Sequence, residues 1–237
     1  MTFLKNNLAN LLTLGNLFSG SIGVIHLIQG DYRTTAFCIV LSLLLDFLDG
    51  FVARALKANS NLGVQLDSLA DMVSFGLLPG VTLYQLLAPF GNEFLGASLS
   101  FRLQYLGLLV TAFSCLRLAI FNLDEDQKYY FKGLNTPSNT ILIFGLYYFL
   151  MENALDWHTE AYRYALVLLT IVSAWLLVSP IRMISMKFKS KALKDNLSKI
   201  ALVLGGLLIL ALFSLAGIPL VIVYYILISL VFRHELR

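Results

Sequence analysis

Long apolar segments alternate with short polar connections along the whole chain. A helix that crosses the hydrocarbon core of a bilayer needs about 20 mainly apolar residues. By that rule the spans are expected at residues 8–29, 34–56, 64–87, 99–122, 137–151, 164–180, 197–216 and 218–232. The fifth is short, and the last two are expected to form a hairpin that turns at Gly217. The pattern predicts an all-α, polytopic membrane helix bundle of about eight transmembrane helices.

The composition agrees with this class. Hydrophobic residues fill 58% of the 237 positions, charged residues fill 13%, and the mean hydropathy is +0.79. Soluble domains are roughly half apolar and a quarter charged. The longest polar stretches, residues 122–136 and 182–196, are too short to bury a core of their own. The composition therefore argues against a separate soluble domain.

Basic residues indicate how the bundle is oriented, because cytoplasmic loops carry an excess of Lys and Arg. If the N-terminus is cytoplasmic, 14 of the 17 basic residues fall on the inner side, and only Arg33, Arg102 and Arg163 fall outside. Both termini are therefore expected in the cytoplasm. The basic residues are scattered over loops and are not interleaved with stacking aromatic residues, so no nucleic-acid partner is expected.

Four aspartates lie near the expected cytoplasmic ends of the second and third spans: Asp46, Asp49, Asp67 and Asp71. A helix turns by about 100° per residue, so each pair shares one helix face, at separations of about 60° and 40°. The short connection at residues 57–61 makes the two spans antiparallel neighbours. The four carboxylates are therefore expected to converge on one small volume.

Carboxylates at membrane depth are costly and usually functional. Hard divalent cations with oxygen ligands relieve the repulsion between such groups, and Mg²⁺ or Mn²⁺ also bind phosphates. A two-metal site for phosphoryl transfer is therefore the favoured interpretation. Gly50 and Gly63 would let a bulky ligand approach closely, although single glycines in spans also serve helix packing. The alternative for the aspartates is an ion relay in a cation- or proton-coupled transporter.

The signature residues lie at fixed spacing. The string Asp46-Phe-Leu-Asp49-Gly50-Phe-Val-Ala53-Arg54 is followed, after eight residues, by Gly63-x-x-x-Asp67-x-x-x-Asp71. This pattern resembles the signature of the CDP-alcohol phosphotransferases, with every defining position and gap present. The stretches 67–76, 117–122 and 131–137 are similar to the branch of that family whose acceptor is serine. The chain departs from the family pattern at Ala9, where a proline is common, and at Ile120, where a second arginine is common.

The resemblance covers about residues 8–180, so residues 1–180 are taken as the catalytic helix core. Residues 181–237 are taken as a basic cytoplasmic loop, which contains the run 187–194, followed by the C-terminal hairpin. The resemblance implies a homodimer. The distribution of basic residues places the active site on the cytoplasmic side of the cell membrane, in a protein that contacts membrane lipids.

The activity implied by the resemblance is metal-dependent transfer of the phosphatidyl group from CDP-diacylglycerol to L-serine, which gives phosphatidylserine and CMP. The four aspartates would hold two divalent cations, Mg²⁺ or Mn²⁺, and Asp71 would be the catalytic base. The residues expected at the CDP-diacylglycerol site are Gly50, Ala53, Arg54 and Gly63.

Serine, as a zwitterion, should meet both a cation and oxygen atoms in its pocket. The residues expected at the serine site are Arg117, Asn122 and Thr136. For Arg117 the alternative is an orientation charge that extends to the lipid head groups. Glycerol 3-phosphate or inositol phosphate remain alternative acceptors. A phosphorylated acceptor would need an extra basic cluster, which the sequence does not clearly show.

Overall fold

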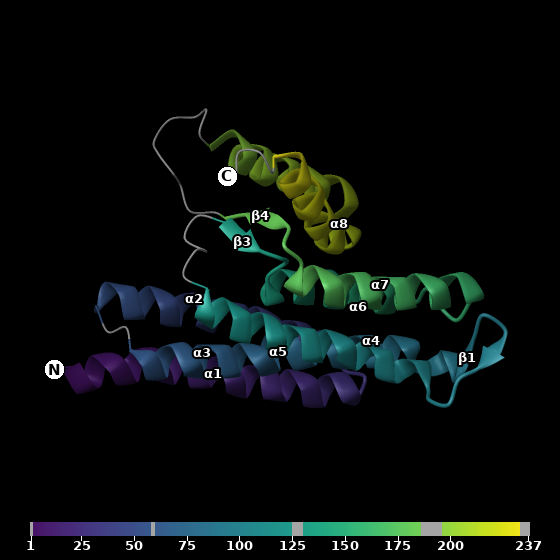
Figure 1. The fold of residues 1–237 in the computed structure, drawn as a ribbon, viewed down its shortest axis with the longest axis horizontal. Helices are drawn as coiled ribbons and strands as arrows, with labels where there is room; N and C mark the ends of the chain where they lie inside the picture. Colours follow the sequence, from purple (N-terminus) through teal and green to yellow (C-terminus); the bar gives the residue numbers. More distant parts are fainter. Residues whose placement is uncertain (1, 58–59, 125–129, 186–195, 233–237) are drawn as a thin grey trace.

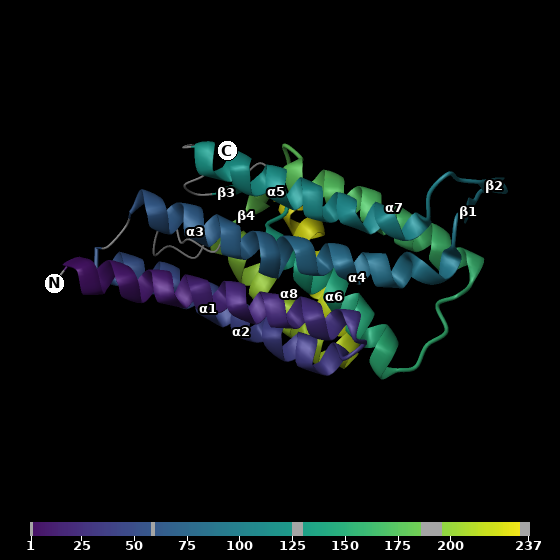
Figure 2. The same cartoon turned by 90° about the horizontal axis from the view of Figure 1, so that it is seen from below.

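The computed structural model describes residues 2–57, 60–124, 130–185 and 196–232. Helices make up 81% of the structure, and Figures 1 and 2 show α1, α2, α3, α4 and α5 running side by side, with α8 packed at an angle against α6. The α-helices in these ranges are α1 (Thr2–Ile28), α2 (Tyr32–Ala55), α3 (Asn61–Asp71), α4 (Leu78–Leu87), α5 (Leu108–Leu123), α6 (Thr136–Glu152), α7 (Glu160–Val178) and α8 (Leu197–Val231). The basic run 187–194 lies outside the described residues.

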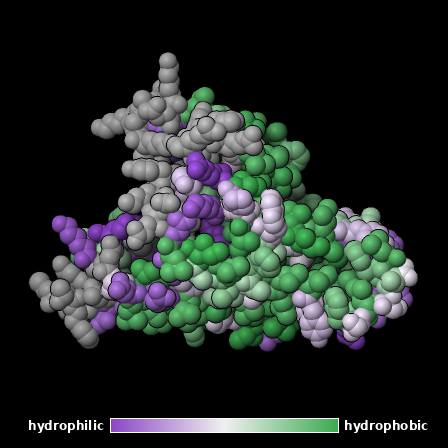
Figure 3. All heavy atoms as spheres, viewed as in Figure 1, coloured by the Kyte–Doolittle hydropathy of each residue, from purple (hydrophilic) through white to green (hydrophobic). Residues whose placement is uncertain are grey.

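Within the described residues, six helical segments are long and apolar enough to cross a membrane: Asn7–Ile28, Tyr32–Ala55, Asn61–Phe90, Leu103–Leu123, Glu160–Val178 and Leu197–Val231. The segment predicted to be short is α6, which has 17 residues. Apolar side chains cover the long helices and α8 in Figure 3, while hydrophilic residues gather toward the end of the bundle where α2 ends. The fold is therefore an all-α membrane bundle, as the sequence pattern predicts.

The break in the last apolar segment lies at Ser214, and the predicted turn at Gly217 is wrong. Ser214 has φ 48° and ψ −120°, which interrupts α8. The Tyr224 hydroxyl donates to the Ala201 carbonyl at 2.9 Å, so the two arms of α8 fold back on each other. A Cβ on Gly217 would lie 3.0 Å from the Ile209 carbonyl oxygen. Gly217 therefore permits close packing of the two arms, and the chain turns at Ser214, where φ is positive.

The third span is a long rod in which the helix type changes. Immediately after Asp71, α3 continues as a π-helix, Met72–Leu77, and then as α4, which ends in a short 3-10 helix, Ala88–Phe90. Single π-turns inside α-helices widen the backbone and are frequent at functional sites. Asp71 therefore occupies the junction between a regular helix and a widened one.

The fourth span begins later than the predicted Leu99. Strands β1 (Glu93–Phe94) and β2 (Ala97–Ser98) form a hairpin, and helical structure starts only with the 3-10 helix Leu103–Gly107. The two turn residues, Leu95 and Gly96, have φ 53° and 77°. Positive φ at both positions suits the right-handed twist of a tight hairpin.

A second pair of short strands lies beside the aspartates' end of the bundle. Strand β3 (Tyr130–Lys132) is antiparallel to β4 (Arg182–Ile184) and ties the segment before α6 to the segment after α7. Side-chain caps fix the nearby helix starts, because Ser60 accepts from the Gly63 amide at 3.0 Å and Asn135 accepts from the Ser138 amide at 2.7 Å. The starts of α3 and α6 are thereby held in place next to the end of α2.

Gly107 provides a test of close helix packing. A Cβ at this position would lie 2.6 Å from the Tyr84 amide nitrogen and 2.8 Å from the Gly80 carbonyl oxygen. Gly107→Ala is therefore expected to destabilise the fold by about 1–3 kcal/mol, measured as a lower thermal unfolding midpoint in detergent. Gly206→Ala is the matched control, because its Cβ would meet its nearest neighbour at an ordinary 3.6 Å. Equal midpoints for the two variants would contradict this account of the packing.

Candidate active site

Three carboxylates meet where α2 lies beside α3. Oxygen atoms of Asp46, Asp49 and Asp67 all lie within 4.8 Å of one another. Asp71 is one turn further along α3 and lines the same cleft. Asp49 is 5% exposed and Asp71 8%. Within the described ranges, no Lys or Arg side chain lies within ion-pair distance of these four carboxylates.

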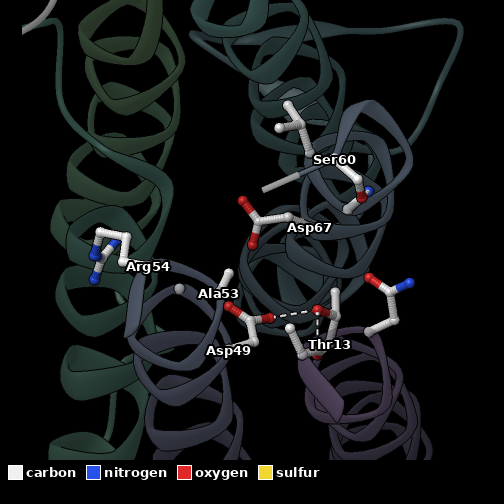
Figure 4. A pocket seen from close by; sticks show the side chains of 11 residues that line it. Thr13, Asp49, Ala53, Arg54, Ser60 and Asp67 are labelled. Carbon is white, nitrogen blue, oxygen red and sulfur yellow. Dashed lines mark hydrogen bonds between the residues drawn. The ribbon is translucent and has the colours of Figure 1, made fainter. Parts of the chain in front are cut away.

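Side chains from α1 hold two of the aspartates. The Thr13 hydroxyl donates to Asp49 Oδ2 at 2.6 Å, as Figure 4 shows, and Asn16 Nδ2 donates to Asp71 Oδ1 at 3.2 Å. Neither contact was predicted from the sequence. Their signal is a run of polar residues at every third position, Asn10, Thr13 and Asn16, inside an otherwise apolar segment.

Among the described residues, two hollows adjoin the carboxylates. The first, which we call the α1–α3 cavity, is lined by Ala9, Asn10, Thr13, Asp49, Gly50, Ala53, Arg54, Ser60, Gly63, Val64 and Asp67 (Figure 4). The second, which we call the central cleft, has a volume of about 370 Å³ and is lined by Asp46, Phe47, Asp49, Gly50, Arg54, Asp67, Ser68, Asp71, Arg117, Leu118, Phe121, Phe131, Asn135, Thr136 and Pro137. The two share Asp49, Gly50, Arg54 and Asp67. The carboxylates therefore stand between two neighbouring binding spaces.

All four residues predicted to contact the CDP-lipid line the α1–α3 cavity: Gly50, Ala53, Arg54 and Gly63. The Arg54 side chain folds back over its own helix, since a Cβ on Gly50 would lie 3.2 Å from Arg54 Nη1. At Gly63, a Cβ would lie 3.2 Å from Ser60 Oγ. Both glycines therefore preserve space beside the aspartates.

The residues predicted for the acceptor divide into two groups. Arg117 and Thr136 line the central cleft, and they are 6% and 1% exposed. Arg117 Nε donates to the Leu134 carbonyl at 2.6 Å, and its guanidinium lies over the Phe121 ring, 5.7 Å from the centroid. A charge extending to lipid head groups would be exposed, so that alternative for Arg117 does not fit.

Asn122 lies behind the wall of the central cleft. Its Nδ2 donates to Ser68 Oγ at 2.9 Å, and Ser68 is one of the lining residues. Asn122 can therefore hold Ser68 in place in the cleft wall, while it does not line the cleft itself.

The oxygen atoms at this site match the ligands that a hard divalent cation prefers. Asp46, Asp49 and Asp67 offer only carboxylate oxygens, which are the ligands that Mg²⁺ and Mn²⁺ prefer. The hydroxyl of Thr13 binds one oxygen of Asp49, which leaves the second oxygen available. Three close carboxylates without a basic partner in the described structure fit a divalent cation site.

Thr13 gives a test of the outer layer of the site, by which we mean the side chains that hydrogen-bond to the aspartates. Thr13→Val keeps the shape of the side chain and removes the donor to Asp49, so Mn²⁺ affinity is expected to fall by about 10- to 100-fold. Titration of the purified protein with Mn²⁺, followed by electron paramagnetic resonance, measures it. Thr170→Val is the matched control, because the buried Thr170 hydroxyl donates only within α7, to the Leu166 carbonyl at 2.8 Å. Equal affinities for both variants would contradict the role of Thr13.

Comparison with known proteins gives a consistent result. The chain is 32% identical over 137 residues to a CDP-diacylglycerol–serine O-phosphatidyltransferase of Helicobacter pylori, which covers 56% of this chain and 54% of that protein. It is 30% identical over 132 residues to the protein of the same name from Bacillus subtilis, covering 56% and 70%. An archaetidylserine synthase of Methanothermobacter thermautotrophicus is 30% identical over 144 residues, covering 59% and 57%.

The chain spans about half the length of most of these curated relatives. The match to the sequence model of the CDP-alcohol phosphatidyltransferases is longer, from residue 6 to residue 176, and includes all the helices that carry the aspartates. With most of its length matched and its acidic residues gathered as described, the chain belongs to the CDP-alcohol phosphatidyltransferase family.

Proposed function

We propose that the protein transfers the phosphatidyl group of CDP-diacylglycerol to L-serine, giving phosphatidylserine and CMP, in a reaction that needs divalent cations. The observation that carries the proposal is the convergence of Asp46, Asp49 and Asp67 within 4.8 Å, beside the cleft that contains the buried Arg117. The names of the relatives from Helicobacter pylori and Bacillus subtilis support serine as the acceptor.

The donor is proposed to bind with its pyrophosphate beside the aspartates. Asp46, Asp49 and Asp67, joined by Asp71, would hold two divalent ions, Mg²⁺ or Mn²⁺. Ions at such a site offset the charge of the pyrophosphate and of the leaving nucleotide.

The α1–α3 cavity takes the polar part of the donor. The Arg54 guanidinium offers paired donors to a phosphate, and Gly50, Ala53 and Gly63 leave room for the nucleotide. The acyl chains remain between helices, in the bilayer.

Asp71 is proposed to act on the acceptor. As the serine hydroxyl oxygen attacks the phosphorus of the phosphatidyl group, a new P–O bond forms and the bond to the CMP oxygen breaks. CMP leaves with the electron pair, and Asp71 receives the hydroxyl proton. The position of Asp71 in the wall of the central cleft, 8% exposed, supports this role.

Serine is proposed to occupy the central cleft. Its carboxylate would meet the guanidinium of Arg117, and the Thr136 hydroxyl would bind a polar group of the amino acid. Asn122 would support this wall through Ser68. Both Arg117 and Thr136 are buried and line the cleft, which supports direct contact.

Competing acceptors test the proposal. The purified full chain in detergent would receive CDP-diacylglycerol, Mn²⁺ and either labelled serine, glycerol 3-phosphate or inositol phosphate. The expected result is CMP release and labelled lipid with serine. Faster CMP release with a phosphorylated acceptor would overturn the choice of serine, and no CMP with any acceptor would overturn the transferase.

We also propose eight membrane crossings, since α6 and the two arms of α8 each offer a helix beside the other long segments. Arg33 binds Glu152 at 2.9 Å at the end of the bundle opposite the aspartates. Together with the 14 of 17 basic residues expected on the inner side, this ion pair supports cytoplasmic termini and a cytoplasmic active site in the cell membrane. The division at residue 180 and a homodimer are proposed from the family resemblance, and the mass of the protein in detergent tests the dimer.

A further inference from the structure

We propose that Asn16 is a positioning residue for the transfer, and that its amide holds Asp71 in the orientation needed to receive the acceptor proton. The inference rests on the proposed function. Asn16 lies in α1 and is 0% exposed. Its Nδ2 donates to Asp71 Oδ1 at 3.2 Å, across 55 positions of the sequence.

The backbone of Asn16 is fixed from two sides. Ser42 of α2 donates to the Asn16 carbonyl at 3.3 Å, and Ser74 of the π-helix donates to the same oxygen at 3.1 Å. Gly20 of α1 packs so closely on Ser74 that a Cβ would not fit. The Asn16 backbone is therefore held where α1, α2 and the π-helix meet, and the amide is presented to Asp71 from that point.

Stability alone does not account for an amide at this position. Asn16 Oδ1 is buried and has no hydrogen-bond partner among the described residues. A buried polar atom without a partner is unfavourable, and an apolar side chain would avoid that cost. Asp71 is the described partner of the side chain, so contact with this carboxylate is the reason to keep an amide here.

The direction of the amide suits a charged carboxylate. A carboxylate only accepts hydrogen bonds, so the NH₂ group and not the amide oxygen must face Asp71. Asn16 thereby occupies one oxygen of Asp71 and leaves the other for the central cleft, where the acceptor is proposed to lie. The contact resembles the outer-layer hydrogen bonds that orient metal-site carboxylates.

The test separates positioning from general stability through kcat and KM. In Asn16→Ala, kcat is expected to fall by about 10- to 100-fold, while the KM for CDP-diacylglycerol stays within about twofold. Asn16→Leu keeps roughly the size of the side chain and removes the donor without adding a charge, so its kcat is expected to fall as far. It also provides the result if the alanine variant does not fold.

Ser19→Ala is the matched control, because it removes one buried hydrogen bond between α1 and α2, to the Cys38 carbonyl at 2.9 Å, and leaves every contact of Asn16 in place. Its kcat per active site, counted by CDP-diacylglycerol binding, is expected to equal that of the wild type. Normal kcat in Asn16→Ala, or an equal loss in Ser19→Ala, would overturn the inference. Wild-type protein assayed in parallel separates the two proposals, because failure to release CMP with serine would instead overturn the proposed function.

Discussion

Asp71→Asn is expected to lower turnover by about 10²- to 10⁴-fold, the range that a positioned general base contributes. The amide has nearly the shape of the carboxylate but cannot receive the serine proton. Asp46, Asp49 and Asp67 form their group without Asp71, so binding of CDP-diacylglycerol is expected to change little. Labelled CMP release under saturating substrates measures turnover, and equilibrium binding of labelled CDP-diacylglycerol measures affinity.

Asp156→Asn is the control for this change. Asp156 lies in the exposed segment between α6 and α7, where its Oδ1 is 2.8 Å from His158 Nδ1. It does not line the central cleft. Its variant is expected to keep normal turnover. If Asp71→Asn made phosphatidylserine at the wild-type rate, the role assigned to Asp71 would be wrong.

Asp46→Ala is expected to act on binding, in contrast to Asp71→Asn. It removes one of the three grouped carboxylates, and loss of a direct ligand should exceed the roughly 10- to 100-fold effect of losing an outer-layer partner. Metal-dependent affinity for CDP-diacylglycerol should therefore fall by more than about 100-fold. Equilibrium binding with and without Mn²⁺ measures it.

The dependence on Mn²⁺ separates this account from misfolding. An excess of Mn²⁺ is expected to recover part of the affinity in Asp46→Ala, because a weakened site fills at higher ion concentration. A variant that had unfolded would gain nothing from added metal. Unchanged affinity at low Mn²⁺ would show that Asp46 is not a ligand.

The placement of the aspartates could be predicted because it depends on local geometry. Spacings of three and four residues set one helix face, and a short connection sets the antiparallel neighbour. The structure places Asp46, Asp49 and Asp67 together as these two rules require. No contact between distant segments was needed to derive that arrangement.

The partners of the aspartates could not be predicted in the same way. Thr13 is 36 positions from Asp49, and Asn16 is 55 from Asp71. Helical periodicity shows that Thr13 and Asn16 share a face, but it does not say which helix that face meets. Polar residues in a membrane helix also serve packing between helices, so their pattern alone does not identify a role.

Two predicted helix boundaries were wrong because tertiary packing, and not the local sequence, sets them. A glycine is the usual place for a break, yet the two arms of α8 need Gly217 for close contact, and Ser214 takes the left-handed conformation. Leu99 continues an apolar run, but the turn at Leu95 and Gly96 forms a hairpin that delays the helix. In both cases tertiary structure overrides the local pattern.

Arg117 illustrates a further limit. Its position near the end of α5 fits either a lipid-facing charge or a residue of the site. The choice follows from the Leu134 carbonyl, which accepts from Arg117 Nε at 2.6 Å and keeps the side chain inside. That carbonyl belongs to the segment before α6, and its location depends on the pairing of β3 with β4.

The grouped aspartates are proposed to bind divalent ions that contact the pyrophosphate of the donor. The most direct measurement is anomalous scattering from crystals of the protein grown with Mn²⁺ and CDP-diacylglycerol. The account predicts Mn²⁺ peaks at roughly 2.0–2.2 Å from oxygen atoms of Asp46, Asp49 and Asp67, next to the donor phosphates. Bound nucleotide without a metal peak among these oxygens, or peaks only elsewhere, would contradict it.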